Sequence, residues 1–319
     1  MLISVQPGVN RRRIGLWIGC VGGLIWAGAA PGDESNPPLG QPGEAAAKAT
    51  ASLPRWQPAG RMPPPTLAEC SGIVASRRYP GIFWVHNDSG HRPAIYAVKE
   101  SGELVAEVPV EGATNSDWED IAADDGGLLY IGDIGNNFGM FPVRSVYQIA
   151  EPDPFAAPVR PARIVRRFKY SYPGQRFNAE GLFVRSGRLF VLSRQPSGRT
   201  GVYRLGALSD KTAPLVEVAS LPVAQVSGAD VSTDGRRLAV CTPNALLVYH
   251  LNAESVPNPD VQPLVVHYPC GSIEGCCFDG EDVVLASEKG LIYRVSAADL
   301  AAGTRFRPPP PPEKRARPR

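Results

Sequence analysis

The sequence predicts an all-β domain between residues 67 and 304. Helical periodicity is nearly absent from this stretch, and short runs of β-branched and aromatic residues alternate with turn residues instead. Short strands at even spacing with turn signals between them are typical of all-β domains. Five of the runs share one arrangement, an apolar strand followed by a polar turn: GIFWVHNDSG, LLYIGDIGNN, RLFVLSRQPSG, RLAVCTPN and DVVLASEKG.

A repeated strand start divides this stretch into five units. Each start has a side chain that carries oxygen, then Gly (Asp120 once), then an apolar strand: SGIVAS at Ser71, EDIAAD at Glu119, EGLFVR at Glu180, SGADVS at Ser227 and EGCCFD at Glu274. The intervals are 48, 61, 47 and 47 residues, and the longest contains a Pro-rich insertion at 151–161. Periods in the forties with about four strands each indicate a β-propeller. We predict five four-stranded blades, with six blades as the alternative, and expect the segment before Glu69 to supply the last outer strand.

The charge distribution argues against a nucleic-acid-binding protein. The net charge is +2, of which Arg11–Arg13 contribute +3 and residues 305–319 contribute +5, so the rest of the chain carries −6. A nucleic-acid binder needs a basic face on the fold itself. We expect instead a small phosphate-bearing ligand, or an extracellular glycan or protein, as the partner.

Both ends of the chain are predicted to lie outside the propeller, which we assign to residues 67–304. In residues 1–30 the basic Arg11–Arg13 are followed directly by the apolar run IGLWIGCVGGLIWAGAA at 14–30. This order indicates a signal peptide or an uncleaved anchor. Residues 31–66 form a Pro- and Ala-rich linker, and residues 305–319 a disordered, Pro-rich basic tail. The protein is therefore expected to be secreted or to lie in the cell envelope or periplasm, and residues 14–30 would anchor it to a membrane if they are not cleaved.

Five cysteines follow the predicted signal segment: Cys70, Cys241, Cys270, Cys276 and Cys277. The number is odd, so at least one is unpaired or pairs with another chain. None of the spacings is typical of a metal site, and we expect most of these residues to be small buried apolar groups.

Equivalent residues of a propeller lie at one height around its axis, because the first strand of each blade lines the central channel. The residues that open the five units should therefore converge: Ser71, Glu119, Glu180, Ser227 and Glu274. Three carboxylates side by side disfavour ionisation unless a cation is present. Carboxylates and hydroxyls are hard ligands that suit Ca²⁺. The alternative is that these side chains only cap strand ends.

The order Ser, Glu, Glu, Ser, Glu at the blade starts resembles the five-bladed calcium-activated nucleotidases (apyrases). WVHNDSG, LYIGDIGNN and IEGCCFD resemble that family's first acidic turn, second glycine-rich turn and last axial glutamate, and the resemblance spans most of residues 69–296. It implies that the five residues above bind an axial Ca²⁺. Three features depart from the family: Asn87-Asp88-Ser89 replaces two aspartates and an arginine, Asp120 replaces a tryptophan, and CTPN replaces an acidic cluster. Phytase-like and lactonase-like propellers are more distantly similar.

The loops after the second strands should return to the face where the axial site opens. Arg194 and Lys289 could clamp a phosphate there, and Asp88 or Asp133 could orient a water or hold a second metal. The alternative is that they are ordinary turn residues, because turns favour Asp and Asn.

Three functions are compatible with these residues. The first is a Ca²⁺-dependent hydrolase of phosphoric anhydrides or esters, and the second is a non-catalytic propeller that binds a glycan or protein. The third is a lactonase- or esterase-like hydrolase, in which a metal polarises a carbonyl. Fold similarity does not decide among them.

Overall fold

The computed structural model describes residues 56–64, 66–206 and 211–305. The predicted signal segment, most of the predicted linker and nearly all of the predicted tail lie outside the described residues. All of the described residues belong to one compact unit of the chain, Ser52–Arg319.

The described residues form antiparallel sheets built from strands that follow one another along the chain, in the order of the predicted repeats. The first repeat contains β2 (Cys70–Ala75), β3 (Ile82–Asn87), β4 (Ala94–Lys99) and β5 (Leu104–Glu111). The second contains β6 (Trp118–Ala123), β7 (Leu128–Asp133), β8 (Val143–Ala150) and β9 (Ala162–Ser171). A parallel pairing of β5 with β9, at Val110 and Ala162, joins these two repeats into one sheet.

The remaining strands form three further sheets. The third repeat contains β10 (Ala179–Arg185), β11 (Arg188–Ser193), β12 (Thr200–Arg204) and β14 (Val216–Leu221), while β13 (Ala213–Pro214) lies beside β9. The fourth contains β15 (Gly228–Val231), β16 (Arg237–Thr242), β17 (Ala245–His250) and β18 (Leu264–His267), with β22 (Thr304–Arg305) at its edge. The fifth contains β19 (Ile273–Asp279), β20 (Asp282–Ser287), β21 (Leu291–Val295) and β1 (Gly60–Arg61).

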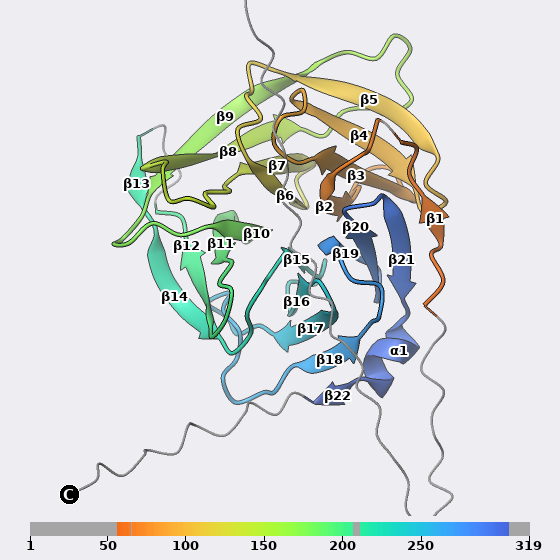
Figure 1. Cartoon of the computed structure of the whole chain (residues 1–319). Coiled ribbons are helices and arrows are strands. Elements are labelled where there is room, and N and C mark those ends of the chain that lie inside the picture. The colour runs from red at the N-terminus through yellow and green to blue at the C-terminus, as the bar shows by residue number, and fades with distance from the viewer. Residues whose placement is uncertain (1–55, 65, 207–210, 306–319) are drawn as a thin grey trace, which may run out of the picture. The chain divides into compact units, whose positions relative to one another are not determined.

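The first strands of the repeats close into a ring. β2 contacts β6, β6 contacts β10, β10 contacts β15, β15 contacts β19, and β19 returns to β2, with the sheets radiating outward from this centre (Figure 1). The protein is therefore an all-β propeller, as the repeat predicts. Counting its blades as five is our interpretation of the sheets.

The last blade takes its outer strand from the N-terminal side of the chain. Gly60 pairs with Ile292 and Arg61 with Leu291, and Met62 and Leu67 are buried beside them. This is the closure expected from the segment before Glu69. It also places Gly60–Arg61, part of the stretch predicted as linker, within the sheet, because β21 would otherwise have an unpaired edge.

Apolar side chains fill the space between each pair of neighbouring repeats. Trp84, Trp118 and Tyr147 pack between the first and second, for example, and Phe183 stacks on Phe190 at the boundary of the third and fourth. The inner strands are buried on both faces. This burial explains why they read as nearly continuous apolar runs in the sequence.

The glycine after four of the five strand starts allows the inner strands to approach closely. A Cβ at Gly72 would lie 2.6 Å from His86 Nε2 and 2.9 Å from Asp120 Cα, and one at Gly275 would lie 3.0 Å from the backbone nitrogen of Ile73. A larger residue would push neighbouring strands apart.

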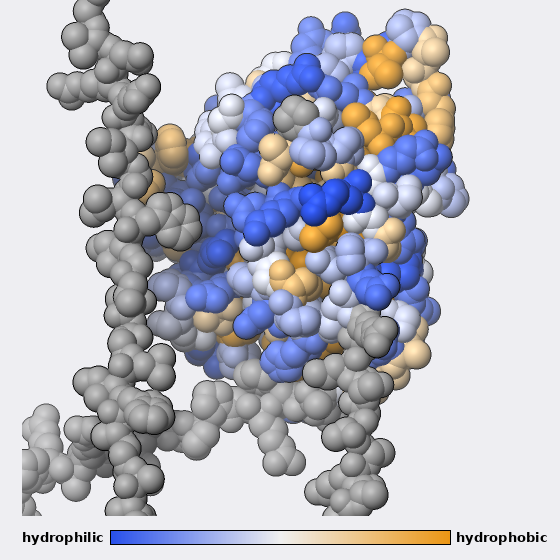
Figure 2. Space-filling model, turned by 45° about the vertical axis from the view of Figure 1, so that its right-hand side comes forward, coloured by the Kyte–Doolittle hydropathy of each residue, from blue (hydrophilic) through white to orange (hydrophobic). Residues whose placement is uncertain are grey.

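The surface is largely hydrophilic on the side that carries β1 and β21, with hydrophobic atoms in small patches (Figure 2). The described residues include the helix α1 (Ala297–Ala302), capped by Ser296. No helix among the described residues is long and apolar enough to cross a membrane.

Candidate functional site

An acidic pocket of about 370 Å³ lies where the inner strands begin, and we call it the axial pocket. Four of the five predicted axial residues line it, whereas Ser227 is not part of its lining. The lining residues are Glu69, Cys70, Ser71, Asp88, Glu119, Asn137, Glu180, Arg194, Glu274 and Glu288. Six carboxylates therefore face one guanidinium.

A β-bulge places each of these four residues in the pocket. The strand register shifts between Cys70 and Gly72, Trp118 and Asp120, Ala179 and Gly181, and Ile273 and Gly275. The residue skipped by each shift is Ser71, Glu119, Glu180 or Glu274. A bulged residue has no partner in the ladder, and the bulge re-aims its side chain. Ser227 precedes β15 and has no such bulge in the described pairing.

The two predicted serine ligands donate their hydroxyls to backbone carbonyls. Ser71 Oγ donates to the carbonyl of Glu119 at 2.9 Å, and Ser227 Oγ donates to that of Ile273 at 2.7 Å. Each hydroxyl thus ties one inner strand to the next. The strand-capping alternative accounts for both contacts.

Arg194 lies among the predicted glutamate ligands. Its Nη1 is 3.2 Å from Glu180 Oε2 and 3.6 Å from Glu274 Oε2. The predicted phosphate clamp is therefore in the pocket, but it is paired with two of the five predicted metal ligands.

Three other carboxylates lie close to one another. Ligand oxygens of Asp88, Asp117 and Glu119 all lie within 4.8 Å of one another, and we call these residues the carboxylate triad. Glu119 is buried, and Asp88 and Asp117 are half-buried. Asp88 was predicted as a water-orienting or second-metal residue, while Asp117 was not predicted.

Burial and mutual repulsion raise the pKa values of these acids. Burial raises the pKa of Glu119 well above its usual range, and the neighbouring carboxylates of Glu180 and Asp88 raise it further. Burial also raises the pKa of Asp88 and of Asp117, and it raises the pKa of Glu274 to about 7. The pocket thus holds more negative charge than it can stabilise unaided.

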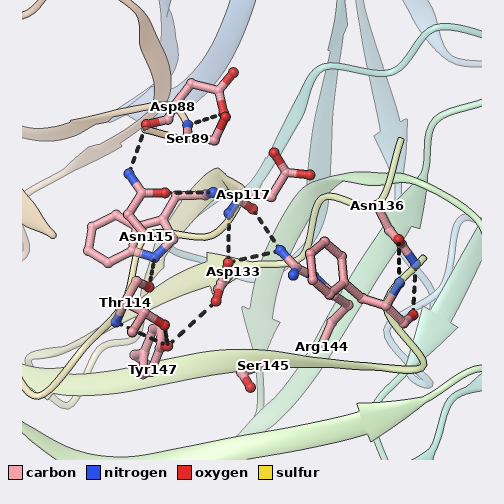
Figure 3. A network of polar contacts seen from close by, with 12 residues as sticks. Asp88, Ser89, Thr114, Asn115, Asp117, Asp133, Asn136, Arg144, Ser145 and Tyr147 are labelled. Carbon is pink, nitrogen blue, oxygen red and sulfur yellow. Dashed lines mark hydrogen bonds and ion pairs between the residues drawn. The ribbon is translucent and has the colours of Figure 1, made fainter. Parts of the chain in front are cut away.

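A polar network holds the triad from behind (Figure 3). The backbone N–H of Asp117 donates to Asp133 Oδ1 at 2.9 Å, and Arg144 Nη2 donates to the same oxygen at 2.8 Å. Asn115 Nδ2 donates to the carbonyl of Asp88 at 2.8 Å, which fastens the Asp88 turn to the Asp117 loop. These contacts fix the two loops that carry Asp88 and Asp117, as outer-shell partners do for metal ligands.

The structure places the other predicted catalytic residues elsewhere. Asp133 is 3 % exposed and forms a buried ion pair with Arg144, so it supports the triad and does not line the pocket. Lys289 is exposed and is also absent from the lining.

The sequence assigned no role to two buried acids on the inner strands, Asp120 and Asp230, or to Asp117, which lies beside the pocket. Asp120 accepts backbone N–H groups from Ile121, Leu182 and Ala229, and Asp230 accepts one from Phe278. Asp117 is two residues before Glu119. That spacing puts alternate side chains on the same side of an extended chain, so it could have identified Asp117.

The donor set of the triad fits a hard divalent cation. Ca²⁺ binds oxygen at about 2.3–2.6 Å, so two of its ligands are at most about 5 Å apart. The spacing within the triad lies inside this limit. Arg194 neutralises part of the charge of Glu180 and Glu274, which leaves Asp88, Asp117 and Glu119 as the acids best placed to bind the ion.

No protein-family model matches the chain, and no curated protein matches it. Its structure is similar to one in a crystal structure of a nidogen/laminin complex, with 12 % identity, a TM-score of 0.45, and 73 % of this chain and 78 % of that chain covered. It is also similar to glutaminyl cyclase from Myxococcus xanthus, with 13 % identity, a TM-score of 0.43, and coverage of 74 % and 92 %. A protein of unknown function from Desulfotomaculum acetoxidans has 14 % identity, a TM-score of 0.39, and coverage of 68 % and 65 %. The propeller fold rests on the sheets themselves and not on these similarities.

Proposed function

We propose that the protein is an exported propeller that binds Ca²⁺ in the axial pocket through Asp88, Asp117 and Glu119. The observation that carries the proposal is the spacing of these oxygens, which lie within 4.8 Å of one another. Asp88 and Glu119 line the pocket together with four further carboxylates, and Asp117 lies beside them. A divalent cation would relieve the repulsion that raises their pKa values. Export rests on the predicted N-terminal signal alone.

The ligand that best fits the loaded pocket is a small phosphate-bearing molecule. Without a cation the pocket would repel an anion, because its lining contains six carboxylates and one guanidinium, that of Arg194. With Ca²⁺ on the triad, an anionic group could bind between the cation and Arg194. Arginine recognises phosphate oxygens with two parallel N–H donors.

Hydrolysis of that ligand is a second candidate, and it is the activity that the resemblance to calcium-activated nucleotidases implies. Bound Ca²⁺ would supply electrostatic stabilisation of phosphoryl oxygens. Among the chain's own groups, Glu274 has a pKa raised by burial to about 7, so its carboxyl can hold or accept a proton near neutral pH. Arg194 would keep the anion in place. Lys289, the other residue predicted to clamp a phosphate, does not line the pocket. With one cationic side chain in its lining, the pocket fits binding of a phosphate-bearing ligand better than its hydrolysis.

Isothermal titration calorimetry tests the proposal on the full chain. Ca²⁺ should bind wild type and Lys289→Gln equally and bind Asp117→Asn at least tenfold more weakly. A nucleoside diphosphate should then bind in Ca²⁺ but not in EDTA, and phosphate release measures turnover. Ligand binding without turnover would identify a non-catalytic binding propeller. Equal Ca²⁺ affinity in wild type and Asp117→Asn would refute the site.

A further inference from the structure

The loop after β7 exposes an unusual amount of apolar surface. Phe138 is 86 % exposed, Met140 65 %, Phe141 40 % and Val143 39 %. Single exposed apolar residues are common on protein surfaces, but a contiguous group of large ones marks an interaction site. The loop is short and its turn is closed by Asn136, whose side-chain amide bonds both backbone groups of Phe141. Phe138, Met140 and Phe141 are therefore presented by a fixed turn, and Val143 begins β8 directly after it.

β9 and the segments that flank it, next to this loop, are strongly basic. Residues 154–179 contain six basic residues and no acidic one, in a chain whose charge outside the two ends is negative. All six are exposed: Arg160, Arg163, Arg166, Arg167, Lys169 and Arg176. Arg163 pairs with Glu111, whereas Arg167 bonds the hydroxyl of Ser145 and Arg176 bonds backbone carbonyls. Most of this charge is therefore not neutralised by acids in the described contacts.

The apolar loop and the basic strand meet at one corner of the molecule. Val143 pairs with Ser171 and Ser145 with Lys169 across β8 and β9. Arg176 Nη1 donates to the carbonyls of Gly139 and Met140 at 3.0 and 3.2 Å. β9 is the outermost strand of its blade, along the upper left of the ring (Figure 1). We call the group Phe138, Met140, Phe141, Lys169 and Arg176 the blade-two corner.

We propose that the blade-two corner binds the surface of an anionic lipid bilayer. Aromatic and thioether side chains at an exposed turn can enter the acyl boundary, while adjacent lysine and arginine side chains attract anionic headgroups. A sulfated glycan would use the same charges but would leave Phe138 and Met140 in water, so the apolar turn favours lipid. This inference is independent of the proposed Ca²⁺ site.

Co-sedimentation of the full chain with vesicles tests it, with phosphatidylglycerol in phosphatidylcholine against phosphatidylcholine alone. The double variant Phe138→Ser/Met140→Ser should lower the partition coefficient at least tenfold. Lys169→Gln should lower it about fivefold on anionic vesicles and much less on neutral ones. Val216→Ser, at an exposed apolar residue of β14, and Arg188→Gln, at an exposed arginine of β11, are matched controls and should leave it unchanged.

A local readout separates the corner from any contact made by the N-terminal segment. In Phe138→Trp, brominated acyl chains should quench a larger share of the fluorescence than in wild type. Quenching equal to that of wild type, or corner variants that partition like the two controls, would overturn the proposal. Binding to soluble heparin that depends on Lys169 but not on Phe138 would instead identify an anionic polymer as the partner and also overturn it.

Discussion

Two groups of buried acids in this propeller differ in what surrounds them. Asp120 and Asp230 lie on inner strands and Asp133 ends β7, and all three accept hydrogen bonds from backbone N–H groups or a buried arginine. Asp88, Asp117 and Glu119 lie at the axial pocket and have other carboxylates as their closest charged neighbours. The first group has the donors that a buried acid needs, so it holds strands together. The second has fewer of them: Asp88 Oδ1 accepts the backbone N–H of Ser89, while neighbouring carboxylates raise the pKa of Glu119. A cation would therefore stabilise these oxygens.

Among the variants that test this difference, Asp120→Ala is expected to change the free energy of unfolding most. The change leaves three N–H groups on β6 and its two neighbours β10 and β15 without their acceptor. Each buried unpaired donor costs about 1–3 kcal/mol, so the free energy of unfolding should fall by about 3 kcal/mol or more. Urea denaturation measures it. Glu119→Gln is the matched control and should change stability by less than about 1 kcal/mol, and equal losses in both variants would erase the distinction.

Asp230→Asn should change the pH dependence of stability. Burial raises the pKa of Asp230 to about 6, against 3.8 for a free aspartate. The folded state therefore favours the protonated acid, and this contribution to stability is present below about pH 4 and lost as the pH rises through about 6. The shift corresponds to about 3 kcal/mol. Relative to wild type, the variant should gain up to that amount between pH 4 and 7. Parallel stability curves would contradict the assignment.

Arg194→Gln tests whether the pocket's arginine competes with a cation. The change removes a positive charge that pairs with Glu180 and Glu274 beside the triad. Ca²⁺ affinity should rise about tenfold, or about 1.4 kcal/mol, while affinity for a nucleotide in Ca²⁺ should fall. Calorimetry measures both. Lower Ca²⁺ affinity in this variant would mean that Arg194 positions the ligands and does not compete.

Lys289→Gln should have the smallest effect. The residue is exposed and does not line the pocket, so stability should change by less than about 0.5 kcal/mol and Ca²⁺ affinity should stay the same. A fivefold loss of nucleotide affinity in this variant would place Lys289 at the ligand, as the sequence suggested.

The fold was predictable because a repeat constrains the whole chain at once. The period located every inner strand, and the Gly after each strand start indicated the close approach now seen at Gly72 and Gly275. The outer strand before Glu69 followed from counting strands in the last repeat. The parallel link between β5 and β9 was not predictable, because it depends on where the insertion at 151–161 returns the chain.

The convergence of four of the five strand-start residues was predictable, but the partners of each side chain were not. The residues at which the bulges occur are Ser71, Glu119, Glu180 and Glu274, and these are four of the five that the sequence repeat identified. The partners of each side chain depend on contacts between distant segments, which sequence order does not show. Arg194 reaches across to Glu274, and Asp133 is held by Arg144 behind the Asp117 loop. Such pairings decide which acids remain available to a ligand.

Thermal unfolding of the full chain in EDTA and in millimolar Ca²⁺ tests directly whether the axial pocket binds the ion. A ligand that binds only the folded state raises the midpoint of unfolding. The midpoint should rise in Ca²⁺ for wild type and Lys289→Gln, and by clearly less for Glu119→Gln and Asp117→Asn. No shift in wild type, or an equal shift in all four proteins, would contradict the proposed Ca²⁺ site.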